Sequence, residues 1–430
     1  MKTNCISGFI FVLAIISHGA TAQNEKSGVP DSIVYNPADV SWRKSAEERI
    51  EKYRKADMGI TVVDDRGNPI PDARIEVKMT RHAFGFGTLI SQARWENIPN
   101  AEVARQQKEL AENYFNKVVT IPTIKQSGDQ MLDWLKERDI EIRGHYLMWA
   151  RIQPGKRRGQ PEVIPEDTLE LRKIAFQYIE EMLTWAGDRI SEWDVINHIT
   201  TSGHLGFDHL FGFEIFADVI KYAKKRAPNA EMGINEGGVL WGNGPSMDEY
   251  YEVIRKLIEL DAKPDAIGFM SHFRKNQLIR MEEIHKRLDK FSELVPHLQL
   301  TELDIDVNDN QLQANYLRDV MTIAFSHPAI FGIVMWNVWG KNNKALWYRD
   351  GTIKPAGKAW LDLVYNQWWT NQTGQTNGDG KFELRGFLGN YEITVQVGNE
   401  TKTQQCHLEP GGNQVNFSMK QAISRGHTVR

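Results

Sequence analysis

Side chains that can transfer protons or act as nucleophiles follow several short apolar runs of this sequence. They are His198, Glu236, His272, Glu302 and Asp304, and the amides Asn197 and Asn235 directly precede two of them. A purely structural role is the alternative for each of them. Glu302 could belong to a buried ion pair, and His272 could be a core histidine whose hydrogen bonds are satisfied. The choice depends on whether the runs bring these side chains to one place.

The apolar runs alternate with longer amphipathic stretches between about residues 84 and 365. They span 84–90, 117–121, 141–149, 193–197, 231–235, 266–270, 299–305 and 330–336, with helical stretches such as 209–226 and 246–260 between them. Eight β–α units of this length predict an α/β protein with a (β/α)8 barrel. A doubly wound sheet is the alternative, but its Gly-rich phosphate loop is missing after the first run. In a barrel, residues at the carboxyl ends of the strands meet at one face.

The motifs at these strand ends resemble those of family 10 glycoside hydrolases, the xylanase family. The family's RGHTLVWH compares with RGHYLMWA at 143–150, its WDVVNE with WDVINH at 193–198, and its IGLQSH with IGFMSH at 267–272. Its TELD recurs at 301–304, and its W-x-x-x-D…SW region compares loosely with 336–347. Five motifs in chain order, each at a strand end, cover about two-thirds of the chain.

The resemblance implies a site that hydrolyses β-linked polysaccharide with retention. Glu302 matches the nucleophile, with Asp304 and His272 as the pair that keeps it ionised. Asn197 matches the asparagine that binds the 2-hydroxyl of the sugar. The implied substrate contacts are Lys125, His145, Trp149, Asn197, His272, Trp336 and Trp347. No cofactor and no metal are expected, and no His or Cys residues have the sequence spacing typical of zinc ligands.

Two positions depart from the family pattern. His198 stands where the family has its acid/base glutamate, and Ile121-Pro122 replace a Glu-Asn pair that binds the next sugar. A retaining glycosidase needs a nucleophile and an acid/base. Three interpretations stay open: His198 is the acid, another carboxylate such as Glu236 or Asp208 supplies the proton, or the site binds glycan without cleaving it. The second departure predicts a substrate other than plain xylan.

Two β-rich segments flank the expected barrel. Alternating residues over 59–63 and 73–79, around an Asp/Gly/Pro turn, predict a β-hairpin, and further strands follow residue 377. Together they resemble a transthyretin-like or carboxypeptidase-regulatory-like β-sandwich. The expected organisation is a signal peptide at 1–22, a leader and helix at 23–56, the first part of the sandwich at 57–80, the barrel at 81–368, the second part at 369–420 and a tail at 421–430.

The first residues and the overall charge bear on location and partners. Lys2, an apolar run over 6–16 and Ala20-Thr21-Ala22 predict a cleaved secretory signal, and hence a secreted or periplasmic protein. No later segment is long and apolar enough to cross a membrane. The net charge of −4 and the lack of a basic patch argue against nucleic acid as a partner. The expected partner is a polysaccharide or oligosaccharide.

Overall fold

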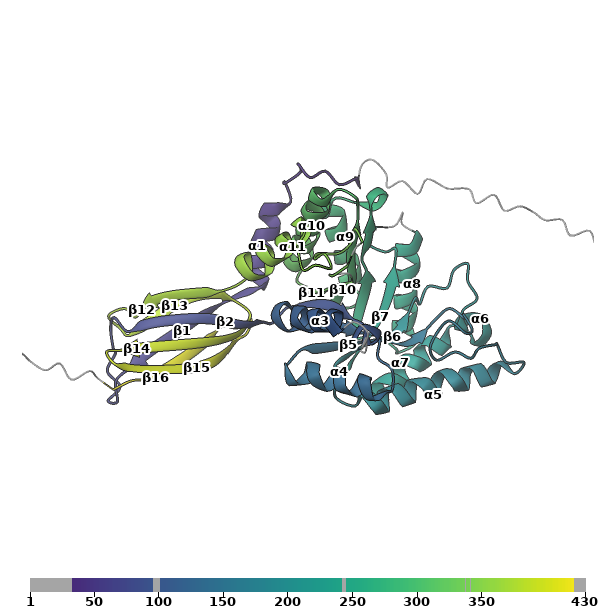
Figure 1. Ribbon diagram of the computed structural model, residues 1–430, viewed down its shortest axis with the longest axis horizontal. Helices are drawn as coiled ribbons and strands as arrows, with labels where there is room; N and C mark the ends of the chain where they lie inside the picture. The colour runs from purple at the N-terminus through teal and green to yellow at the C-terminus, as the bar shows by residue number, and fades with distance from the viewer. Residues whose placement is uncertain (1–32, 96–100, 242–244, 337, 341, 421–430) are drawn as a thin grey trace, which may run out of the picture.

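The computed structural model describes residues 33–95, 101–241, 245–336, 338–340 and 342–420. A large α/β unit and a smaller all-β unit lie side by side along the long axis of the molecule (Figure 1). The expected signal peptide and tail lie outside the described residues. Among the residues that are described, no helix combines the length and the apolar character needed to cross a membrane.

The large unit is a closed barrel of eight parallel strands, which confirms the predicted (β/α)8 fold. The strands are β3 (Gly85–Ile90), β4 (Lys117–Thr120), β5 (Glu141–Trp149), β6 (Glu192–Asn197), β7 (Glu231–Gly237), β8 (Ala266–Met270), β10 (Leu298–Asp306) and β11 (Ile330–Met335). Each pairs with its neighbour in chain order, and β11 closes the ring by pairing with both β10 and β3. β4, β6 and β8 are buried along their whole length, as parallel strands covered by helices must be.

Helices cover the outside of the barrel (Figure 1). They are α2 (Gln92–Trp95), α3 (Ala101–Tyr114), α4 (Gln126–Glu137), α5 (Thr168–Ala186), α6 (Phe207–Phe211), α7 (Glu214–Arg226), α8 (Pro245–Glu259), α9 (Met281–Ser292), α10 (Asn310–Ser326) and α11 (Pro355–Asp362). Aspartate side chains begin two of them by accepting hydrogen bonds from the first turn. Asp167 accepts from Leu169 N, and Asp309 accepts from the amides of the first turn of α10. A short strand β9 (His272–Arg274), a 3₁₀ turn η3 (Lys275–Gln277) and a π-helical turn η4 (Leu363–Gln367) complete this unit.

The smaller unit is a β-sandwich made from both sides of the barrel segment. One sheet contains β13 (Lys381–Phe387), β1 (Lys55–Val63) and β16 (Asn413–Ser418), in that order. The other contains β12 (Asn371–Gln375), β2 (Arg74–His82), β14 (Gly389–Val397) and β15 (Glu400–Leu408). Buried side chains alternate along β1 and β2, so that Ile60, Val62, Ile75 and Val77 face the core between the sheets. Helix α1 (Arg43–Tyr53) precedes the sandwich and packs against α10.

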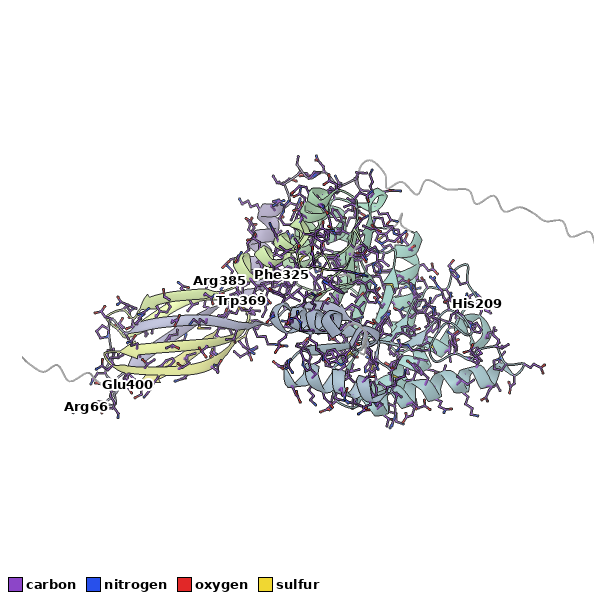
Figure 2. All side chains as sticks on the ribbon, viewed as in Figure 1. Arg66, His209, Phe325, Trp369, Arg385 and Glu400 are labelled. Carbon is purple, nitrogen blue, oxygen red and sulfur yellow. The ribbon has the colours of Figure 1, made fainter. Side chains whose placement is uncertain are left out.

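The predicted hairpin of β1 and β2 is wrong. The two strands belong to different sheets, and only Val63 and Pro69 form an isolated bridge between their flanks. The chain between them crosses from one sheet to the other, because each strand finds its partners after the barrel rather than in its neighbour. The labelled Arg66 lies in this crossing at the end of the sandwich farthest from the barrel (Figure 2).

Candidate active site at the carboxyl ends of the barrel strands

Glu302 lies near the carboxyl end of β10 with 5% of its surface exposed. Its Oε1 accepts a hydrogen bond from Asn235 Nδ2 at 3.0 Å, and its Oε2 lies 3.0 Å from His272 Nε2. The carboxylate is therefore held on both oxygens by side chains from β7 and β9. This fixes its orientation before any ligand arrives.

His272 lies between two carboxylates. Its Nε2 faces Glu302, and its Nδ1 forms an ion pair with Asp304 Oδ2 at 3.0 Å. Burial alone would lower the pKa of His272, but the contacts with Asp304 and Glu302 outweigh burial and raise the pKa to about 9. The ring is thus an imidazolium at neutral pH. Lys344 adds a second cation to Asp304 at 3.1 Å.

Asn235 joins the nucleophile candidate to Asn197. Its Nδ2 donates to Asn197 Oδ1 at 3.1 Å as well as to Glu302, and its Oδ1 accepts from Thr301 Oγ1 at 2.7 Å. The sequence motifs assign Asn235 no role, although it ends the fifth apolar run next to Glu236. Its strand-end position was the available signal, but its three partners become visible only in three dimensions.

A buried ionic network supports the next wall of the site. His145 on β5 lies with its Nδ1 2.6 Å from Asp194 Oδ2, and Asp194 also pairs with Arg143 in the barrel interior. Burial raises the pKa of Asp194, but the charge of Arg143 and the hydrogen bond to His145 outweigh burial. The net effect is a pKa of Asp194 below its usual range. The ring of Trp336 lies edge-on to His145 and His272, with centroids 5.6 and 6.0 Å away. His145, His272 and Trp336, three of the residues expected to bind substrate, therefore lie together.

His198 follows Asn197 in a left-handed backbone conformation with φ of 55°. This conformation is uncommon for a residue other than glycine and costs free energy that neighbouring contacts must offset. The amide of His198 donates to Asn235 O at 2.9 Å, its Nδ1 lies 3.0 Å from Glu236 Oε1, and its ring meets Trp149 edge-on at 4.5 Å. The side chain keeps 22% of its surface exposed. The imidazole is therefore fixed by one nitrogen while part of it faces solvent.

Glu236 and Asp208 are the two other carboxylates that the sequence offered as acids. Besides His198, Glu236 accepts from Gly237 N at 2.8 Å, Thr200 N at 2.8 Å and Thr200 Oγ1 at 2.7 Å. Four donors thus surround the buried Glu236 carboxylate. Asp208 lies on α6 and accepts a hydrogen bond at 2.7 Å from Oγ1 of Thr201, which lies on the loop after β6. Its contacts are with that loop and with His209.

Three remaining candidates lie in different surroundings. Trp149 is buried, and the guanidinium of Arg157 lies 3.6 Å from the centroid of its ring. Lys125 is exposed at the start of α4. Trp347 stacks on Tyr114 of α3, with ring centroids 5.7 Å apart. The structure therefore does not bring Trp347 into contact with Glu302 or His272, and its role with substrate stays a prediction.

A cluster of His285, Asp289 and His327 lies outside this site. Their candidate ligand atoms lie within 4.8 Å of one another. His285 and His327 each place a ring nitrogen on Asp289, at 2.9 and 3.1 Å, and the second nitrogen of His327 accepts from Ala329 N. His285 and Asp289 are one turn apart on α9, but His327 lies 38 positions beyond Asp289, so sequence spacing could not reveal the whole cluster. That pattern fits a carboxylate bridging two neutral histidines.

The comparisons with known proteins place the barrel in a family. The glycosyl hydrolase family 10 model matches residues 77–362. The anti-sigma-I factor RsgI6 of Acetivibrio thermocellus is 27% identical over 375 residues, which cover 84% of this chain and 48% of that protein. Endo-1,4-beta-xylanase 1 of Arabidopsis thaliana is 25% identical over 84% of this chain and 38% of its own length. The chain thus spans about half or less of these two relatives.

Two further matches cover more of the other protein. Endo-1,4-beta-xylanase B of Thermotoga neapolitana is 26% identical over 309 residues, which cover 69% of this chain and 81% of that enzyme. The crystal structure of xylanase 10B from Thermotoga petrophila in complex with xylobiose superposes with a TM-score of 0.57 and 18% identity, over 66% of this chain and 95% of that one. The structural match shows the shared barrel. The family model spans the whole barrel, and the chain belongs to glycosyl hydrolase family 10.

Proposed function

We propose that this chain hydrolyses β-linked polysaccharide of the xylan type with retention of configuration, with Glu302 as nucleophile and His198 as acid/base. The observation that carries the proposal is the position of Glu302, held by His272 and Asn235 beside Asn197 at the carboxyl ends of the strands. Active sites of barrel enzymes lie at this face. The xylanases among the relatives support the substrate class.

The reaction would proceed in two displacements. Glu302 attacks the anomeric carbon while the His198 imidazolium gives its proton to the leaving oxygen, so the glycosidic bond breaks and a glycosyl ester forms. Neutral His198 then takes a proton from water, whose oxygen attacks the same carbon and releases Glu302. The His272 imidazolium offsets the charge of Glu302 whenever the carboxylate is free. An imidazole is suited to both proton transfers because a ring nitrogen can donate a proton in one step and accept one in the next.

A glycan-binding protein without turnover is the second candidate. Two observations favour it: a histidine follows Asn197, and the nearby Glu236 is enclosed by four hydrogen-bonding groups. The anti-sigma-I factor among the relatives is compatible with this candidate. In this candidate, the residues around Glu302 would hold a sugar chain while no bond breaks.

Glu302→Gln separates the two candidates. Release of reducing ends is measured on a panel of plant and algal polysaccharides, with wild type, Glu302→Gln and the matched variant Glu383→Gln at an exposed glutamate of the β-sandwich. The hydrolase predicts activity in wild type and the control and none in Glu302→Gln, because an amide is not a nucleophile of comparable strength. Folding is checked by circular dichroism. Near-normal turnover by Glu302→Gln would exclude the mechanism, and retention on a polysaccharide gel without release of reducing ends would favour the binder.

A further inference from the structure

A cavity of about 460 Å³ opens at the junction of the β-sandwich and the barrel. It is lined by the end of β2, the last residues of α3, the turn before β5, and η4 with the segment that follows it. The labelled Trp369 marks this junction (Figure 2). These segments lie at the amino ends of the barrel strands, whereas Glu302 lies at the carboxyl ends. The cavity is therefore separate from the candidate active site, and junctions between domains are frequent places for ligand sites.

Aromatic rings form a row along this cavity. Tyr365 and Trp369 both line it, with ring centroids 5.1 Å apart. Tyr114 continues the row, 6.2 Å from Tyr365, and stacks on Trp347 at 5.7 Å. Tyr114 also lines a second cavity of about 270 Å³ together with Trp347. Tyrosine and tryptophan offer flat apolar faces with polar edges, which suits ligands that are themselves amphipathic.

The polar lining of the larger cavity is balanced in charge. Arg81 pairs with Asp139 at 3.4 Å, and Arg138 pairs with Glu112 at 3.1 Å. His82 adds no charge at neutral pH, because burial lowers its pKa to about 3. Two guanidinium groups beside two carboxylates offer donors and acceptors without a net charge. Such a lining favours a neutral polyhydroxy ligand over an anion or a cation.

We infer that this junction is a second, non-catalytic binding site for a neutral β-linked oligosaccharide. Pyranose rings would stack along Tyr365 and Trp369 while their hydroxyl groups exchange hydrogen bonds with the two Arg–carboxylate pairs. The ligand class rests on the proposed function, since it is taken from the polysaccharide that the barrel would process. A second site at the opposite end of the barrel would hold a long polymer to the protein while another stretch of it occupies the active site.

The test counts binding sites in protein that cannot hydrolyse. Xylohexaose is titrated into full-length Glu302→Gln by calorimetry, with cellohexaose and laminarihexaose as further neutral probes. The inference predicts that two oligosaccharide molecules bind per protein chain. Asn390→Arg, which places a long side chain in the cavity, should remove one equivalent, and Trp369→Ala should weaken that site about tenfold or more, a loss of 1.4 kcal/mol or more. Tyr53→Ala, at an exposed aromatic on α1, is the matched control and should bind like the parent.

The outcomes distinguish this inference from the proposed function. One equivalent that Asn390→Arg leaves unchanged would overturn the second site while the active site stands. Equal losses in Tyr53→Ala would also overturn it. Binding of no probe at either site would count against both. Asn390→Arg removes no aromatic ring from the fold, so it remains informative if Trp369→Ala fails to fold.

Discussion

Glu236 controls the orientation of the residue that would move the proton. Its Oε1 lies 3.0 Å from His198 Nδ1, so the ring nitrogen directed away from Glu236 is the one that can reach a glycosidic oxygen. Glu236→Gln keeps the shape but removes the charge that stabilises an imidazolium. We expect turnover to fall by up to about 10²–10⁴-fold, the whole contribution of a general acid.

Asp208→Asn is the matched control for this change, since Asp208 is hydrogen-bonded to the neighbouring loop and its replacement should leave turnover nearly unaltered. The measurement is kcat and kcat/KM for both variants on the same substrate. Unchanged turnover in Glu236→Gln would show that Glu236 is only structural.

His198 itself is tested by two substitutions. His198→Ala should lower turnover by about 10²–10⁴-fold if the imidazole transfers the proton. His198→Glu installs the residue that the resemblance to the family implies at this position. It should lower activity on the native glycan if His198 is a working acid, and raise activity on xylan if the site has decayed. His209→Ala, a largely exposed histidine nearby, serves as control. If neither change at 198 alters rate or binding, His198 has no part in the reaction.

Several site residues could be predicted from sequence because each lies at a strand end and in a family motif. Glu302, His272 and Asn197 lie in one hydrogen-bonded group. Asn235 could not be selected in the same way, since its role depends on partners from β6 and β10 that share no sequence spacing with it. The pairing of Glu236 with His198 was hidden for the same reason.

At the scale of elements, β1 and β2 depend on strands that come after the barrel. β1 pairs with β13 and β16, and β2 pairs with β12 and β14. Deleting residues 370–430 removes all these partners, so we predict rapid tryptic cleavage at Arg74 and Lys78, detected by mass spectrometry. Full-length protein under the same protease is the control. Persistent protection after the deletion would show that these strands are held by the barrel instead.

Strand positions were easier to predict than strand partners. Each of the eight barrel runs overlaps an observed strand, because parallel strands with adjacent connections need only local hydrophobic runs and amphipathic helices. The hairpin prediction failed because alternation identifies a half-buried strand but not the strand beside it. The hydrogen bond from Ala73 N to Thr376 Oγ1 joins residues 303 positions apart, and no local pattern specifies such a partner.

For the whole molecule, buried histidines predict a stability maximum near pH 6.5. The folded state raises the pKa of His272 from 6.5 to about 9, so its contribution is complete below pH 6.5 and is lost as the pH rises through 9. The folded state lowers the pKa of His327 to about 4 and that of His82 to about 3, so their contribution is lost as the pH falls from 6.5 through these values.

Melting temperatures measured by thermal unfolding between pH 4 and pH 9.5 test this stability maximum. His272→Asn should flatten the alkaline side, whose full amplitude is at most about 3 kcal/mol, and leave the acid side unchanged. A wild-type melting temperature that does not fall above pH 7 would contradict the role of His272 as an imidazolium between two carboxylates.

The insertion of the barrel within the β-sandwich has a consequence for synthesis on the ribosome. Strands β1 and β2 emerge first, but their partners emerge only after the whole barrel, at a translation rate of about 5–20 residues per second. During this interval the barrel can already fold, while β1 and β2 still expose apolar faces and unpaired edges. Such edges are prone to pair with other chains. We therefore expect chaperones to stay bound to β1 and β2 longer than to any other part of the nascent chain. The β-sandwich should be the last part to become resistant to protease during translation.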